Sequence, residues 1–181
     1  MENDYLSKSK NWIRQFVIGR QLCPFAKAVW DKKQIRFVYF EGKTTAALAE
    51  VLQRELELLR NTPASEIDTT VLVHPFLLND FYDYLDFVAK GETLIADLNL
   101  EGEIQLASFH PNYQFAGTKP SAAENYTNRS PYPMLHLLRE ESISIALEHY
   151  PNPASIPEKN IACMNEIGAP QLKQMLHDFK R

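Results

Sequence analysis

The sequence predicts an α/β fold with a small, mainly parallel sheet of three or four strands packed by N-terminal, crossover and C-terminal helices. Two observations lead to this fold class. Short strand-like segments alternate with helix-length amphipathic segments between residues 35 and 109, which is typical of strands joined by helical crossovers. Each connection is also long enough for a crossover between parallel strands. The length of 181 residues predicts one domain over residues 1–181.

The first part of the chain supplies three of these elements. Residues 10–20 carry apolar side chains at helical spacing, which predicts an opening amphipathic helix. Residues 35–40 are rich in β-branched and aromatic side chains, which predicts a strand. An apolar stripe between residues 44 and 60 predicts the first crossover helix. Thr44 or Thr45 can cap its N-terminus.

The next segments repeat this alternation. Residues 69–73 predict a second strand, and Asn79 or Asp80 is expected to cap a second crossover helix. Residues 103–109 predict a third strand that ends at His110. A short fourth strand near residues 113–116 remains an alternative to a loop there.

Beyond residue 133 the spacing predicts helices again. Four residues share one helical face: Leu135, Leu138, Ser142 and Ile145. The segment from Ser155 to Glu158 matches a capping box. Gly168 followed by Pro170 predicts that one helix stops and the next begins. We expect this helical tail to cover an exposed face or edge of the sheet.

The composition excludes several classes of protein. The six glycines are all more than ten positions apart, so the paired glycines of dinucleotide, Walker, kinase and nucleophile-elbow motifs are missing. A net charge of −4 without a basic patch argues against nucleic-acid binding. No long apolar run or signal-peptide core is present, and two cysteines are too few for a disulfide framework. We therefore expect a cytoplasmic protein without a membrane partner.

Residues 110–133 break the pattern, because they fit neither a helical nor a strand period. Loops of this length are usually functional or disordered, and four aromatic side chains argue against disorder. These are Tyr113, Phe115, Tyr126 and Tyr132. Asn125, Asn128 and Arg129 add polar groups, and the prolines of the segment stiffen it. We expect an ordered, polar-lined loop that either carries the function or only plugs the end of the sheet.

Two predicted strands end in the same dipeptide, His74-Pro75 and His110-Pro111. In a parallel sheet both histidines would lie at the carboxyl edge, where open α/β sheets bind ligands. The following proline forces an extended backbone at each histidine. The imidazoles could act as acid and base, with His110 the main catalytic candidate. The alternative is that each histidine only bonds a neighbouring carbonyl at the end of its strand.

Cys23 precedes Pro24 and could therefore lie at a helix N-terminus, where the helix dipole stabilises a thiolate. Residues 22–26 resemble the Cys-Pro-aromatic start of glutaredoxins and omega-class glutathione transferases. This chain departs from them, because Ala26 stands where a second cysteine is usual and the preceding segment is helical. Cys23 is a second catalytic candidate, and the alternative is a small buried side chain.

Arg129 precedes a predicted helix in which Ser130 would be the N-cap and Pro131 the first residue. A guanidinium beside a helix N-terminus is suited to phosphate or carboxylate, although Arg129 could instead pair with an acidic residue. The other substrate-binding candidates are Asn125, Asn128, Tyr126, Tyr113 and His74.

Metal sites are a weaker possibility. His136 and Glu140 lie four residues apart on the predicted helix, but they are only two ligands. Cys23, His74 and His110 could form a mixed site if the N-terminal helix reached the carboxyl edge. Neither set is sufficient to predict a metal, and the cofactor stays unknown.

Three motifs carry a wider resemblance that spans nearly the whole chain: LCPFA at 22–26, SFHPxYQFAGT at 108–118 and NYTNRSPYPMLHLLRE at 125–140. With them the chain resembles a bacterial family of uncharacterised proteins, catalogued as a domain of unknown function. The resemblance implies a stand-alone domain without a settled activity, and it assigns no catalytic residues.

The expected function is that of an enzyme, or a former enzyme, with a pocket for a small anionic metabolite at the strand carboxyl ends. His110 would be the acid or base, Arg129 the anion anchor, and the 110–133 loop the cover. Two alternatives remain open: a non-catalytic interaction module that uses the tyrosine-rich loop, and a thiol-redox protein centred on Cys23. A pocket at that edge would favour the enzyme, and a flat apolar patch would favour the module. The substrate, the reaction and the oligomeric state do not follow from the sequence.

Overall fold

The computed structural model describes residues 3–181. The predicted alternation of strands and helices is present: β1 (Ile35–Tyr39), α3 (Thr45–Asn61), β2 (Thr69–Val73), α4 (Phe81–Asp97) and β3 (Ile104–Phe109). Side-chain oxygens of Thr44 and Asp80 cap α3 and α4, because each accepts a hydrogen bond from an otherwise unpaired N–H of the first turn. The α/β class is confirmed.

The elements at the two ends of the chain complete the fold. Before β1 lie α1 (Asp4–Trp12), the π-helical turn η1 (Ile13–Ile18) and the short helix α2 (Ala26–Asp31). After β3 follow η2 (Ala123–Thr127), β4 (Met134–Arg139), α5 (Glu140–Glu148), η3 (Pro153–Ser155), α6 (Ile156–Ile167) and α7 (Ala169–Asp178). Within residues 3–181, none of the helices has both the length and the apolar character that crossing a membrane requires.

The sheet has the strand order β1-β2-β4-β3. β1 pairs with β2 in parallel, whereas β4 pairs antiparallel with both β2 and β3. The three predicted strands therefore share one direction, as expected, but the sheet is mixed because β4 runs the opposite way between two of them. The ends of β1, β2 and β3 consequently lie at one edge with the start of β4, and we call this the strand carboxyl edge.

The prediction of a helix directly after residue 133 is wrong, because residues 134–139 form β4. Leu135 and Leu137 are buried in the core beneath α3 and α4, while Met134 belongs to the core on the other face. A central strand that is buried on both faces is apolar at nearly every position, so it also satisfies a helical spacing. His136 and Glu140 consequently share no helix, since Glu140 is the first residue of α5.

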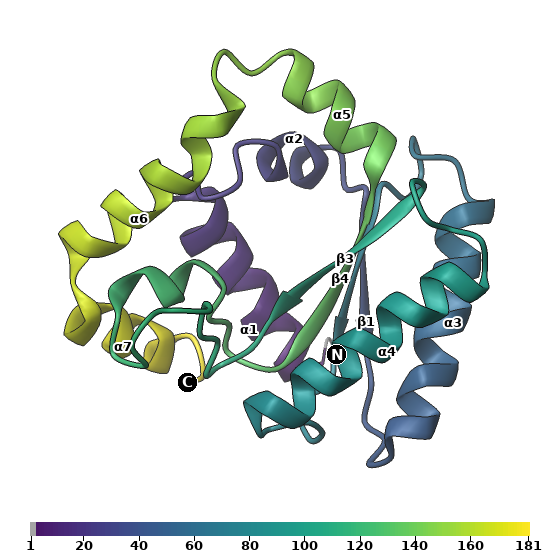
Figure 1. The fold of residues 1–181 in the computed structure, drawn as a ribbon, viewed down its shortest axis with the longest axis horizontal. Coiled ribbons are helices and arrows are strands. Elements are labelled where there is room, and N and C mark those ends of the chain that lie inside the picture. The colour runs from purple at the N-terminus through teal and green to yellow at the C-terminus, as the bar shows by residue number, and fades with distance from the viewer. Residues whose placement is uncertain (1–2) are drawn as a thin grey trace.

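Two layers of helices cover the two faces of the sheet. Figure 1 shows α3 and α4 flat against one face, and α1 with the C-terminal helices on the other side. The α3–α4 layer packs closely on the sheet, because Leu48, Leu56 and Leu72 have no exposed surface, although a groove of about 420 Å³ lies between α3 and α4. Gly91 of α4 allows this approach, since a Cβ there would lie 2.8 Å from Leu106 Cδ2.

The C-terminal helices pack partly on the 110–133 loop. α6 and α7 both contact η2, and their residues Met164 and Leu172 are buried there with Tyr126. Gly168 has a φ of +83° between the two helices, so the predicted stop and restart is confirmed. The capping box at Ser155 is not formed, because its hydroxyl donates to the Asn152 carbonyl instead.

Candidate functional site

Both histidines of the His-Pro dipeptides come to the strand carboxyl edge. His74 and His110 have no exposed surface. Their rings lie against the ring of Tyr84, with centroids 6.0 and 5.0 Å away. The Tyr84 hydroxyl donates to the Met134 carbonyl and accepts from the Phe109 N–H. Tyr84 therefore ties the end of β3 to the start of β4 between the two imidazoles.

The backbone occupies both nitrogens of His110. Nε2 donates to the Leu78 carbonyl at 3.1 Å, and Nδ1 accepts from the Asn112 N–H at 3.0 Å. Burial lowers the pKa of His110, so the imidazole is held neutral with its proton on Nε2. Acid–base catalysis by His110 would first require one of these two hydrogen bonds to break.

His74 has one free nitrogen. Nδ1 donates to the Leu77 carbonyl at 3.1 Å, whereas Nε2 has no hydrogen-bond partner among residues 3–181. Burial is the main cause that lowers the pKa of His74 to about 4, because a charged imidazole would lose its hydration there. His74 is therefore neutral near pH 7, with its free lone pair inside the protein.

The 110–133 loop is ordered by its own polar groups. Asn125 is fully buried, and its side-chain oxygen accepts from the Phe115 N–H and the Thr118 hydroxyl. Its amide nitrogen donates to the Lys119 carbonyl. Asn128 donates to the Ser108 carbonyl. These amides hold the loop together, and they have few hydrogen bonds left for an anion.

Arg129 also bonds within the loop. Its guanidinium donates to the carbonyls of Tyr113 and Pro120, and it lies 4.6 Å from the ring centroid of the buried Tyr126. Ser130 donates to the Tyr132 carbonyl and caps no helix, because the chain enters β4. The helix N-terminus predicted beside Arg129 is therefore not formed, and the crevice beside Arg129 has no room for a water molecule.

The structure does not bring Cys23 to this edge. Cys23 precedes α2, and α2 lies at the opposite end of the sheet from the start of α4 (Figure 1). The helix begins only at Ala26 and has six residues, so Pro24 is not its first residue. Burial raises the pKa of the Cys23 thiol, the reverse of the shift that favours a thiolate. Within residues 3–181, no three His, Cys, Asp or Glu side chains are grouped to hold a metal ion.

The accessible aromatic groups of the edge lie outside the loop. Phe76, in the connection from β2 to α4, is 45% exposed, and Tyr82 in the first turn of α4 is 73% exposed. Leu85 follows one turn later at 37%. The loop tyrosines Tyr113 and Tyr126 are half-buried and buried. The helical periodicity of α4 places Tyr82 away from the buried face. This signal in the sequence could have identified Tyr82 as an exposed aromatic residue.

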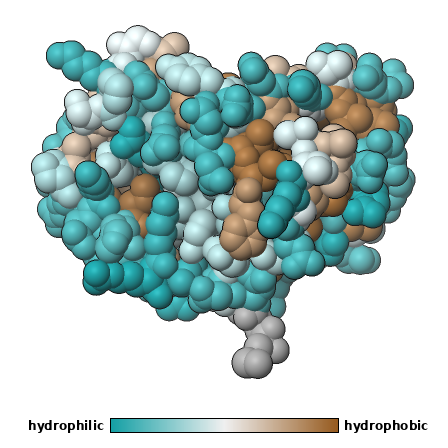
Figure 2. Space-filling view, turned by 90° about the horizontal axis from the view of Figure 1, so that it is seen from below, coloured by the Kyte–Doolittle hydropathy of each residue, from teal (hydrophilic) through white to brown (hydrophobic). Residues whose placement is uncertain are grey.

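Phe76 also belongs to a second aromatic group, the tyrosine cluster, which comprises Tyr5, Tyr39, Phe76 and Tyr132. The ring of Tyr5 in α1 lies 5.8 Å from Tyr39, 5.1 Å from Phe76 and 5.0 Å from Tyr132. Four separate segments thus bring aromatic rings together at the strand carboxyl edge. Figure 2 views this side of the molecule and shows hydrophobic side chains gathered among hydrophilic ones.

Comparison with known proteins adds one match. The model of a family described as "Protein of unknown function (DUF1415)" matches residues 4–174. No curated protein and no solved structure matches the chain.

Proposed function

The chain belongs to this family of unknown function, and we propose that it is a non-catalytic protein-interaction module. Its docking face, as we define it, comprises Phe76, Tyr82 and Leu85 with the neighbouring carboxylates Asp80, Asp83 and Asp86. The partner is a protein segment that combines lysine or arginine with apolar side chains. The observation that carries this proposal is the exposure of Tyr82 (73%) and Phe76 (45%) at the strand carboxyl edge.

The exposed aromatic side chains are informative because they lie at the strand carboxyl edge. Open α/β sheets use this edge for recognition, and exposed aromatic groups supply much of the binding energy in protein interfaces. The groups expected to bind an anionic metabolite there are instead bonded to the backbone: His110, Asn125 and Arg129. The edge therefore supports docking of a macromolecule better than enclosure of a small anion.

The charge of the docking face selects the partner. Asp80, Asp83 and Asp86 are exposed; Asp80 caps α4 and the other two lie in its first two turns, beside Tyr82. Carboxylates pair with lysine and arginine, and both cations also interact favourably with aromatic faces. A basic amphipathic segment satisfies both features, whereas an acidic segment would be repelled. We place this interaction in the bacterial cytoplasm, and the two free cysteines fit a reducing compartment.

The proposal can be tested with short synthetic peptides and the ¹⁵N-labelled protein. A leucine–lysine peptide should shift amide signals of residues 76–86, and the affinity should fall with added salt. A peptide with glutamate in place of lysine should bind much more weakly. The variant Tyr82→Ser/Leu85→Ser should weaken binding by about tenfold.

Two matched controls accompany these variants. Leu58→Ser changes a leucine of α3 with a similar exposure of 38%, and Asp97→Asn changes an exposed carboxylate at the far end of α4. Both should leave peptide affinity unchanged, whereas Asp83→Asn/Asp86→Asn should lower it. Equal binding of the lysine and glutamate peptides would overturn the proposal. So would self-association that the Tyr82→Ser/Leu85→Ser variant abolishes, because the occupant would then be a second copy.

A further inference from the structure

The α3–α4 groove, as we call it, lies between residues 45–52 of α3 and 87–97 of α4 and has a volume of about 420 Å³. Its floor is apolar, because Leu52 and Phe87 are buried there and Ala49 and Leu94 are half-buried. Pockets that bind small molecules have volumes of about 300–1,000 Å³ and mostly apolar linings. The groove therefore has the room and the surface that a small ligand requires.

Two charged side chains without partners line the groove. Lys90 and Asp97 of α4 are both exposed, and neither side chain forms an ion pair or a hydrogen bond within residues 3–181. Asp86, one turn before Lys90, does not pair with it. Lys90 and Asp97 lie two turns apart on one side of α4, so their Cα atoms are separated by about 10.5 Å. The groove thus has a cation and an anion at a defined spacing.

The position of Asp97 is unfavourable for the helix itself. Asp97 is the last residue of α4, where the negative end of the helix dipole disfavours a carboxylate. Arg60 reaches this end of α4 and donates to the Leu98 carbonyl, but it pairs with Glu103. A cationic group of a ligand would therefore be stabilised by Asp97 and by the end of the helix together.

The Lys90 end of the groove is the positive end. α3 and α4 run in the same direction, because each joins two strands that share one direction. Leu52 lies beside Gly91, since a Cβ there would be 3.2 Å from Leu52 Cδ2. Thr45, two turns before Leu52, is therefore on the side of Lys90 and away from Asp97. The first turn of α3 adds its positive dipole end to the charge of Lys90.

We propose that the α3–α4 groove binds a short apolar peptide with free termini. An extended tripeptide spans about 10 Å, so its carboxylate can pair with Lys90 while its ammonium pairs with Asp97. The Thr45 hydroxyl, which has no partner within residues 3–181, can donate to a peptide carbonyl. The Thr93 hydroxyl donates to the Ala89 carbonyl and can still accept from a peptide N–H. The peptide side chains lie on the apolar floor.

Other ligands match these groups less well. A fatty acid would leave Asp97 without a partner, and a single amino acid is too short to reach both charges. A helix of a partner protein has no free termini to place between Lys90 and Asp97. The groove shares no residue with the docking face, so this proposal and the proposed function can fail separately.

The test uses the tripeptide Ala-Leu-Ala and the ¹⁵N-labelled protein. The peptide should shift amide signals of residues 45–52 and 87–97, and not those of residues 76–86, which report on the docking face. N-acetylated and C-amidated forms of the peptide each lose one charge. Each form should bind about fivefold more weakly than the free peptide, because one exposed ion pair is lost.

Matched variants assign the two ends of the groove. Lys90→Gln should weaken binding of the free peptide about fivefold and leave binding of the C-amidated form unchanged. Asp97→Asn should weaken the free peptide equally and leave the N-acetylated form unchanged. Lys173→Gln, at an exposed lysine of α7, should affect none of the peptides. Ala49→Leu should fill the groove and abolish binding of every form.

Three results would overturn the proposal. The first is that the free peptide at millimolar concentration shifts no signal of the groove. The second is that a peptide with both termini capped binds as tightly as the free one, or that either Lys90→Gln or Asp97→Asn binds like the parent. The third is self-association that Ala49→Leu abolishes, because the occupant would then be a second copy. If Ala49→Leu fails to fold, the two variants at exposed positions decide the question.

Discussion

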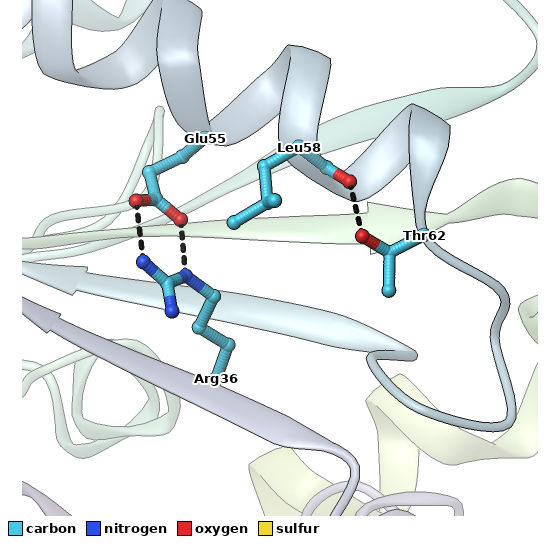
Figure 3. Close-up of polar contacts among 4 residues, drawn as sticks. All are labelled: Arg36, Glu55, Leu58 and Thr62. Atoms are coloured by element: carbon cyan, nitrogen blue, oxygen red, sulfur yellow. Dashed lines mark hydrogen bonds and ion pairs between the residues drawn. The ribbon is translucent and has the colours of Figure 1, made fainter.

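Arg36 of β1 and Glu55 of α3 form an ion pair through two hydrogen bonds, of 2.6 and 3.0 Å (Figure 3). Glu55 is buried, whereas the Arg36 side chain is 39% exposed. The pair raises the pKa of Arg36. It attaches α3 to the outermost strand of the sheet, at a place where β1 has a neighbouring strand on one side only.

Arg36→Met should therefore lower the free energy of unfolding by about 2 kcal/mol, because Glu55 would stay buried without its partner. The partial exposure of Arg36 keeps the loss below that of a fully buried pair. Urea unfolding at pH 7 measures the change. Arg36→Met/Glu55→Leu should be more stable than the single variant, since it leaves no unpaired carboxylate. A single variant as stable as the parent would contradict this account.

The protein should lose stability in mild acid. Burial lowers the pKa of both His74 and His136 to about 4, whereas an unfolded histidine has a pKa of about 6.5. Between these values the unfolded chain binds more protons, so the free energy of unfolding falls as the pH drops from about 6.5 to about 4. Each histidine contributes roughly 3 kcal/mol to this fall.

Urea unfolding from pH 8 to pH 4 measures this dependence. A His136→Leu variant that folds should show a shallower fall over the same range, because one of the buried histidines that titrate there is gone. His177, which is exposed, provides the control, and His177→Leu should leave the slope as it is. A parent protein with constant stability between pH 6.5 and pH 4.5 would rule out neutral buried histidines.

Asn125→Ala should loosen the 110–133 loop without unfolding the sheet. The substitution leaves the Phe115 N–H, the Thr118 hydroxyl and the Lys119 carbonyl without a shared partner. We expect a loss of about 3 kcal/mol, since three hydrogen bonds are removed. Amide hydrogen exchange should accelerate at residues 113–128 and remain slow in β2 and β4. Asn112→Ala, at an exposed position of the same loop, should change neither, and unchanged exchange in Asn125→Ala would show that Asn125 does not order the loop.

Cys23 should react slowly with iodoacetamide at neutral pH. Burial raises the pKa of its thiol, so the half-point of alkylation should lie above about 8.5, the ordinary value for cysteine. The measurement is made on Cys163→Ser, so that Cys23 alone is labelled. A half-point below the ordinary value would restore the thiolate chemistry that its sequence context suggested.

Local patterns in the sequence predicted the elements that local chemistry determines. Neighbouring residues alone limited the helix caps to Thr44 or Thr45 and to Asn79 or Asp80, of which Thr44 and Asp80 are the caps. They also identified the His-Pro endings of β2 and β3. β4 was mistaken for a helix because a strand buried on both faces has no alternation of polar and apolar residues. Ser130 and Pro131 strengthened the error, since the same pair is typical of a helix start.

The candidate sites depended on contacts between distant segments, which no local pattern contains. Thr69 meets His136 only because β4 inserts beside β2 in a particular register. Tyr5 meets Tyr132 because the first turn of α1 lies at the strand carboxyl edge. Asn125 and Arg129 were recognised as polar loop residues, but their partners are backbone carbonyls and N–H groups. Hydrogen bonds to the backbone cannot be predicted from the types of side chain in the sequence.

The position of β4 also determines the order in which this protein can fold. During synthesis β1, β2 and β3 emerge first, yet β3 has no neighbour until residues 134–139 arrive and bridge it to β2. Because these pairings join residues far apart in the chain, closing them is slow. A nascent chain that ends before residue 134 can therefore pair β1 with β2, but its β3 has no neighbouring strand. The four-stranded sheet can therefore be completed only after residue 139 has been made.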